Sequence, residues 1–169
     1  MKRTRAGSRI SAVLCLGTAL TAHVAAADER FVGKLALPNG QTAVIAEGDL
    51  EARSIGSYTV RLYSPVGGTS GAGTDATTFV TGLFEKRDGV IESVMLADVD
   101  RDGRDEIVVV MRSVGTGSYL TAHAITVREK RLEMRATVVG LAKDADPVAA
   151  LLAATAKEAD PNRGPAKHP

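Results

Sequence analysis

The sequence predicts an all-β protein: an antiparallel β-sandwich of about eight strands with a short C-terminal helix. Three observations predict this fold. Short runs of alternating apolar and polar residues recur at regular spacing, as in strands with one buried face. The hairpin dipeptides Asn39-Gly40 and Asp88-Gly89 each separate two of these runs. Beyond residue 145 the alternation ends, and alanine and leucine dominate a segment that favours a helix.

Eight segments carry the strand pattern. Segment 106–111 is the most apolar and is expected to be a central strand. In segment 57–63, Tyr58 falls on the same face as Val60 and Leu62. The predicted strands are 31–37, 42–47, 57–63, 78–85, 90–97, 106–111, 119–128 and 131–138.

The connections and the helix follow from local residue types. The turn at 38–41 is expected to join the first two strands, and segment 64–77 is a glycine-rich loop. Asp146 is expected to cap a helix that begins at Pro147. The helix is expected to close one end of the sheets with the face formed by Val148, Leu151, Leu152 and Thr155.

The chain opens with the three parts of an export signal. Four basic residues lie within the first nine, an apolar run over 10–20 follows, and small residues fill 22–27. The apolar run is too short to span a membrane, so we expect cleavage, export to the periplasm and no remaining membrane segment. The predicted organisation is a signal peptide over 1–27, one β-sandwich domain over 28–158 and a tail over 159–169.

Loss of the signal changes the composition of the mature chain. Cys15 leaves with it, so the exported domain has no disulfide and depends on its hydrophobic core. Four of the 21 Lys and Arg residues leave as well; 17 then stand against 20 Asp and Glu, a net charge near −3. This balance disfavours nucleic acid as a partner.

Catalytic motifs are scarce. The mature chain keeps His123, within a predicted strand, and His168, in the tail, and neither adjoins a serine or cysteine nucleophile motif. No pair of carboxylates is recognisable as a glycosidase pair. The sequence therefore favours a binding protein over an enzyme. An exported hydrolase that uses His123 and carboxylates is an alternative.

The acidic segment 98–106 (DVDRDGRDE) matches the first half of a calcium loop, with acidic residues at alternate positions and glycine at the sixth. Predicted strands flank it, and Val109 stands where an EF-hand has glutamate, so it is not an EF-hand. Two interpretations stay open: a calcium site, or a solvated turn whose charge is partly balanced by Arg101 and Arg104. The candidate metal ligands are Asp98, Asp100, Asp102 and Glu106.

The loop 112–121 (RSVGTGSYLT) joins two predicted strands and carries the residue types of a protein-binding surface. Its glycines are expected to take positive φ and to let the backbone approach a partner, while its hydroxyls, arginine and tyrosine supply contacts. A plain glycine-bearing turn is the alternative. A shorter echo, 53–58 (RSIGSY), suggests a second contact strip. The candidate partner-binding residues are Arg112, Ser113, Gly115, Thr116, Gly117, Ser118, Tyr119, Ser54 and Tyr58.

Six runs, taken in order, resemble the periplasmic inhibitors of invertebrate-type (i-type) lysozyme. The resemblance covers about residues 31 to 152, nearly all of the mature chain, and depends on the number and order of the runs. The runs are 37–42 (LPNGQT), 46–49 (AEGD), 53–58 (RSIGSY) with 60–63 (VRLY), 96–103 (LADVDRDG), 112–117 (RSVGTG) and 140–150 (GLAKDADPVAA).

The resemblance implies a β-sandwich that inhibits lysozyme by inserting a loop into the enzyme's active-site cleft. That loop carries a Ser-Gly-x-Tyr pattern in the family, which matches Thr116 to Tyr119 here, with threonine in place of serine. The hydroxyl and the phenol would hydrogen-bond with the catalytic carboxylates of the enzyme. The resemblance thus implies i-type lysozyme as the partner and leaves a homodimer open. A calcium-dependent adhesion or carbohydrate-binding module built on 98–106 is the alternative function.

Overall fold

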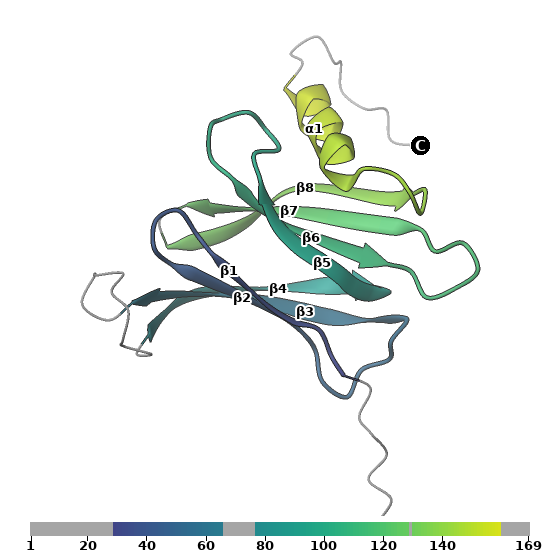
Figure 1. The fold of residues 1–169 in the computed structure, drawn as a ribbon, viewed down its shortest axis with the longest axis horizontal. Helices are drawn as coiled ribbons and strands as arrows, with labels where there is room; N and C mark the ends of the chain where they lie inside the picture. Colours follow the sequence, from purple (N-terminus) through teal and green to yellow (C-terminus); the bar gives the residue numbers. More distant parts are fainter. Residues whose placement is uncertain (1–28, 66–76, 129, 160–169) are drawn as a thin grey trace, which may run out of the picture.

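The computed structural model describes residues 29–65, 77–128 and 130–159. Within them, eight strands form two four-stranded antiparallel sheets that face each other, and one helix follows (Figure 1). The predicted all-β sandwich with a C-terminal helix is confirmed. The predicted signal peptide at 1–27, the part of the glycine-rich loop over 66–76 and the tail from residue 160 onwards lie outside the described residues.

The first sheet contains the N-terminal strands in sequence order, each antiparallel to its neighbour. They are β1 (Val32–Ala36), β2 (Thr42–Glu47), β3 (Ile55–Pro65) and β4 (Thr77–Asp88). The predicted hairpin between β1 and β2 is confirmed, because the amide of Leu37 donates to the carbonyl of Gln41 at 2.8 Å and Gly40 takes φ +80°. Such a φ favours glycine.

The second sheet contains the remaining strands, again in sequence order. They are β5 (Val90–Ala97), β6 (Glu106–Arg112), β7 (Leu120–Arg128) and β8 (Arg131–Leu141). Strand β6 lies between β5 and β7, so its predicted central position is confirmed. It is apolar on both faces because each face is covered: Ile107 and Val109 pack against the first sheet, while Val108 and Val110 face the opposite way into a second core.

The helix α1 (Pro147–Glu158) builds that second core on the outer face of the second sheet. Leu151 is fully buried there among the small side chains of Ala122 and Ala124, which let the helix approach β7 closely. Asp146 caps the helix as predicted, since its carboxylate accepts from the amides of Val148 and Ala149 at 2.9 and 3.2 Å. The expectation that α1 closes an end of the sandwich was wrong: it covers a sheet face.

The predicted hairpin at Asp88-Gly89 was also wrong. Strands β4 and β5 belong to different sheets, and Gly89 carries the chain from one sheet to the other. Its backbone groups find partners outside any hairpin: its amide donates to the carbonyl of Ser54 at 2.9 Å, and its carbonyl accepts from the guanidinium of Arg87. The positive φ of +96° at Gly89 suits either connection, so the dipeptide alone does not distinguish them.

Candidate functional site

Four connections meet at one end of the sandwich, which lies at the right in Figure 1. They are the segment 48–54 before β3, Gly89 before β5, the loop 113–119 before β7 and the segment 142–146 before α1. Gly89 fits tightly against the backbone of Arg112 and Ser113: a Cβ at Gly89 would lie 2.0 Å from the Arg112 carbonyl oxygen. Backbone contacts thus fix where the 113–119 loop leaves the sheet.

The loop 113–119 is closed by its own backbone. The amide of Ser113 donates to the carbonyl of Tyr119 at 2.9 Å, and the amide of Ser118 donates to the carbonyl of Gly115 at 3.4 Å. Ser118 takes a φ of +45°, an uncommon conformation for a residue other than glycine. The tip over residues 114–117 is exposed, as is Tyr119 at 56%. The loop therefore exposes its side chains to solvent while hydrogen bonds within its backbone hold it closed.

Arg112 holds this loop from beneath. Its Nη1 donates to the carbonyls of Ser118 and Lys143 at 3.0 and 3.3 Å. Its other guanidinium nitrogens form a two-pronged ion pair with Glu92, at 2.6 and 2.8 Å, which raises the pKa of Arg112. Arg112 was predicted to contact a partner; in this structure its guanidinium connects three segments of its own chain. Glu92 and the Lys143 carbonyl had no signal in the sequence, because their closeness depends on strand register.

The glycines of the loop differ from their predicted role. Neither Gly115 nor Gly117 takes a positive φ. Instead, Gly117 leaves room for the aromatic ring of Tyr119, because a Cβ there would lie 2.2 Å from the ring carbon Cε2. Gly115 faces open space. Gly117 therefore sets the direction of the Tyr119 ring, a constraint that residue spacing did not reveal.

Replacing Gly117 with alanine is expected to weaken partner binding about fivefold or more, a cost typical of an interface side chain that has been displaced. The added methyl group would push the Tyr119 ring from its position, while the exposed loop would tolerate the change in folding. Gly115→Ala is the matched control, since a methyl group there meets no atom within 4 Å. Equal binding by both variants, measured by calorimetry, would refute this role of Gly117.

The two candidate partner-binding residues of the segment 53–58 differ in exposure. Ser54 is exposed and lies at the same end of the molecule, connected to Gly89 through its carbonyl. Tyr58 was wrongly predicted to contact a partner: it is fully buried in the core, with its Oη 2.7 Å from Nδ1 of His123 in a hydrogen bond. Burial raises the pKa of Tyr58 and lowers that of His123, so this pair is neutral near pH 7.

Lowering the pH from about 7.5 to 5 is expected to destabilise the parent protein more than a His123→Gln variant. Because burial depresses the pKa of His123 below 6.5, the unfolded chain takes up a proton before the folded one does. This stability is complete above the unfolded pKa and is lost as the pH falls through the folded pKa, at no more than about 1.4 kcal/mol per pH unit. Melting temperatures at stepped pH measure the difference, and parallel curves would contradict it.

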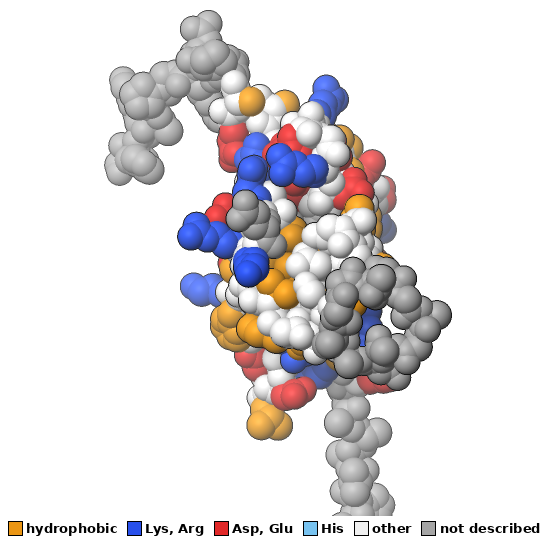
Figure 2. Space-filling view, turned by 90° about the vertical axis from the view of Figure 1, so that its left-hand side faces the viewer, with side chains coloured by type: hydrophobic (Ala, Val, Ile, Leu, Met, Phe, Trp, Pro, Cys, Tyr) orange, Lys and Arg blue, Asp and Glu red, His pale blue; other side chains and the backbone are white. Residues whose placement is uncertain are grey.

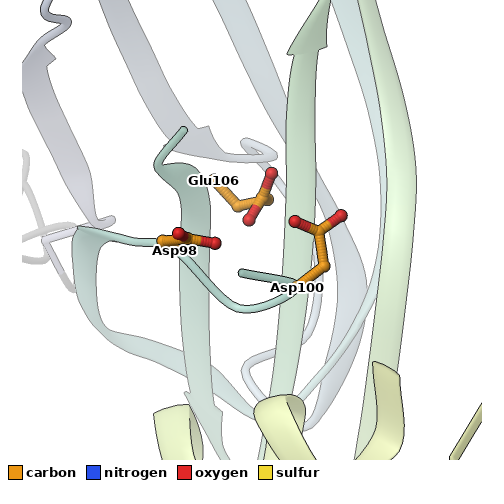
Figure 3. A group of neighbouring side chains, drawn as sticks. All are labelled: Asp98, Asp100 and Glu106. Atoms are coloured by element: carbon orange, nitrogen blue, oxygen red, sulfur yellow. The ribbon is translucent and has the colours of Figure 1, made fainter. Parts of the chain in front are cut away.

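The acidic segment 98–106, called the acidic turn below, lies at the other end of β6, far from the loop 113–119 (Figure 1). One oxygen from each of Asp98, Asp100 and Glu106 lies within 4.8 Å of the others, and Figure 3 shows these carboxylates turned toward a common space. Asp102 is not part of this group. Its carboxylate accepts from the amide of Arg104 at 2.9 Å and pairs with the Arg104 guanidinium at 3.5 Å.

The three carboxylates have unequal surroundings. Glu106 is fully buried and accepts from the amide of Val99 and the hydroxyl of Thr126, at 3.1 and 3.3 Å. Burial raises the pKa of Glu106, and the nearby Asp100 adds to that effect. Asp100 pairs with Arg135 at 2.8 Å, which lowers the pKa of Asp100. Figure 2 shows acidic and basic side chains close together over this end of the molecule.

Comparisons with known proteins agree with this fold. A family model described as periplasmic lysozyme inhibitor of I-type lysozyme matches residues 29–155. A crystal structure of such an inhibitor from Aeromonas hydrophila is 38% identical to this chain, with a TM-score of 0.62, and covers 72% of this chain and 98% of its own. The Aeromonas hydrophila inhibitor in complex with Meretrix lusoria lysozyme is 40% identical, with a TM-score of 0.60, and covers 72% and 94%. No curated protein matches the chain.

These comparisons give no support to the adhesion or carbohydrate-binding module considered as an alternative. The family description is periplasmic, the compartment that the N-terminal segment predicted. Within the described residues, no helix is long and apolar enough to cross a membrane. The family model spans both sheets and most of α1, and the two solved structures match almost over their full length. The chain therefore belongs to the family of periplasmic inhibitors of i-type lysozyme.

Proposed function

We propose that this protein inhibits i-type lysozyme in the periplasm by placing the loop 113–119 in the enzyme's active-site cleft, and so protects peptidoglycan. The observation that carries the proposal is the exposed Tyr119 on a loop that Arg112 and Glu92 clamp from beneath. A loop already held in one conformation loses little entropy on binding, so its contacts contribute more fully to affinity.

The chemistry of the loop suits a glycosidase cleft. Such clefts place two carboxyl groups on either side of the scissile bond, and these groups accept hydrogen bonds when ionised. Thr116 and Tyr119 are exposed and carry hydroxyl donors on either side of Gly117, which has no side chain to obstruct the approach. In this proposal the protein acts by binding alone, with no catalytic step of its own.

Inhibition assays with three lysozyme types test this function. The lysis of peptidoglycan by an i-type lysozyme, such as that of Meretrix lusoria, is expected to fall to near zero as the protein approaches equimolar amounts. Chicken-type and goose-type enzymes in parallel reactions are expected to keep their activity. Full activity of the i-type enzyme at excess protein would refute the proposal.

We also propose that the acidic turn takes up one calcium ion, as a stabilising group at the end opposite the loop 113–119. One observation favours it: Oδ1 of Asp98 is buried and has no hydrogen-bond partner within the described part of the chain. This oxygen and the buried carboxylate of Glu106 are hard ligands of the kind that calcium binds. The ion would offset the repulsion among the three carboxylates.

Calcium at millimolar concentration is expected to raise the melting temperature of the parent by a few degrees, because an ion bound only by the folded state stabilises it by mass action. The Glu106→Gln variant is expected to show a much smaller shift, since it lacks one charged ligand. Magnesium serves as the control for ionic strength. Identical melting curves of the parent with calcium and with a chelator would refute the site, and inhibition of lysozyme is expected to be the same in both.

A further inference from the structure

A groove opens between the two sheets directly beside the loop 113–119. Its volume is about 750 Å³. Ile55 and Lys86 line it from the first sheet, and Thr121 and Val139 line it from the second. Met111 and His123 also line it and are buried, so they form its floor. Ser113 and Tyr119 of the loop form part of its wall.

Three large apolar side chains stand exposed around this groove, while Lys86, Arg87 and Asp88 add charged groups to its lining. Ile55, Tyr119 and Val139 are 67%, 56% and 70% exposed, and they are three of the eight large hydrophobic side chains exposed within the described residues. They come from β3, the loop and β8, which lie far apart in sequence, yet they border a single groove. Exposed apolar side chains scattered singly need no explanation, whereas a group around a concave surface marks an interaction site.

We infer that this groove binds an apolar side chain of the same lysozyme that receives the loop, projecting from the rim of the enzyme's cleft. The inference rests on the proposed function. Tyr119 belongs to both surfaces, so an enzyme that encloses the ring must also approach the groove. The groove thus continues the interface, and its apolar rim identifies the chemistry of the group that fills it.

The floor of the groove suits such an occupant. The Oη of Tyr58 hydrogen-bonds with Nδ1 of His123, so this polar pair is already satisfied within the protein. An incoming apolar side chain would leave that hydrogen bond intact, and it would displace water from the apolar rim, which favours binding.

Two substitutions on opposite walls test the inference: Ile55→Asn and Val139→Asn. Each replaces an exposed apolar side chain with a neutral polar one, which avoids a charge effect on the acidic enzyme cleft. Each is expected to raise the inhibition constant against i-type lysozyme about tenfold, as for side chains near the centre of an interface. The matched control is Val32→Asn on β1, which is 63% exposed at the opposite edge of the first sheet and is expected to inhibit like the parent.

The outcomes distinguish a failure of the groove inference from a failure of the proposed function of the loop. If Tyr119→Ala loses inhibition while both groove variants inhibit like the parent and keep its melting temperature, the groove inference is overturned and the proposed function stands. If the parent inhibits no i-type lysozyme, the proposed function fails and the groove inference fails with it. Light scattering completes the test: groove variants that change the oligomeric state and leave the inhibition constant unchanged would assign the groove to a second copy of the chain and overturn the inference.

Discussion

Replacing Tyr119 with alanine is expected to weaken inhibition of i-type lysozyme by about 2 kcal/mol or more, which is roughly a 30-fold rise in the inhibition constant. Tyrosine is prominent among the residues that dominate interface energies, because it buries a large rigid ring and adds a hydroxyl. In the free protein that ring is 56% exposed, so the area is available for burial on binding.

Because Tyr119 is exposed, the weaker inhibition is expected without a loss of folding. A side chain that is mostly in solvent contributes little to the core, so the melting temperature of Tyr119→Ala is expected to stay near that of the parent. Val114→Ala is the matched control for the removal of an exposed side chain from this loop, because Val114 lies on the same loop and is also 56% exposed. Tyr119→Phe isolates the hydroxyl and is expected to lie between the parent and the alanine variant. Parent-like inhibition by Tyr119→Ala would remove the loop from the proposed mechanism.

The strands were predictable because their signals are local. Alternation is set by which side chains meet the core, so the sequence alone located β2 and β5 with the bounds seen in the structure. The continuous apolar run of β6 indicated a central strand, although the helix that covers its second face came as a structural finding. The sequence also placed the functional loop between β6 and β7. That position determines at which end of the sandwich the loop lies.

Other features depended on contacts between distant segments. The role of Arg112 needs Glu92 and the Lys143 carbonyl beside it. The pairing of β5 with β6 brings Glu92 close, and the pairing of β7 with β8 brings the segment after β8 close. The Asp88-Gly89 dipeptide fits a hairpin and a crossing between sheets equally well. Tyr58 is a different case, because its alternation with Val60 and Leu62 already indicated burial. The similarity of its segment to the loop 112–121 obscured that signal.

Arg87 is the least predictable of these residues. It lies in β4 beyond the predicted strand 78–85, and the sequence does not show what would offset the cost of burying its charge. In the structure it is 1% exposed, and its guanidinium donates to the carbonyls of four residues. Those residues are Ala52, Arg53, Ser57 and Gly89. It therefore ties the segment before β3 to the crossing between the sheets.

Two glutamates, the buried Glu47 and the partly exposed Glu51, complete this network. Oε1 of Glu47 lies 3.9 Å from Nε of Arg87, and Oε2 of Glu51 lies 3.8 Å from its Nη2. Glu47 is buried and also accepts from the amide of Ile91 at 2.6 Å. The hydroxyl and amide of Ser57 donate to Glu51 and lower the pKa of its carboxyl group. Each member of the network thus depends on several others.

Replacing Arg87 with methionine is expected to lower the free energy of unfolding by about 3–5 kcal/mol, the usual cost of removing one partner from a buried ion pair. Methionine fills much of the volume, but it leaves the four carbonyls without their donor and the carboxylate of Glu47 with less compensating charge. Urea denaturation measures the change. Lys86→Met is the matched control, because it removes one positive charge from the neighbouring, exposed position and is expected to shift stability by less than about 0.5 kcal/mol.

The same substitution should reach the inhibitory loop through Gly89. Because Gly89 fits against the backbone of Arg112 and Ser113, a crossing that has lost its Arg87 contact no longer fixes the base of the loop. At temperatures where Arg87→Met is still folded, we therefore expect weaker inhibition of i-type lysozyme than that of the parent. Stability within about 1 kcal/mol of the parent would show that the buried guanidinium is nearly isoenergetic with an apolar side chain. Parent-like inhibition by a destabilised variant would show instead that the loop is held by Arg112 and Glu92 alone.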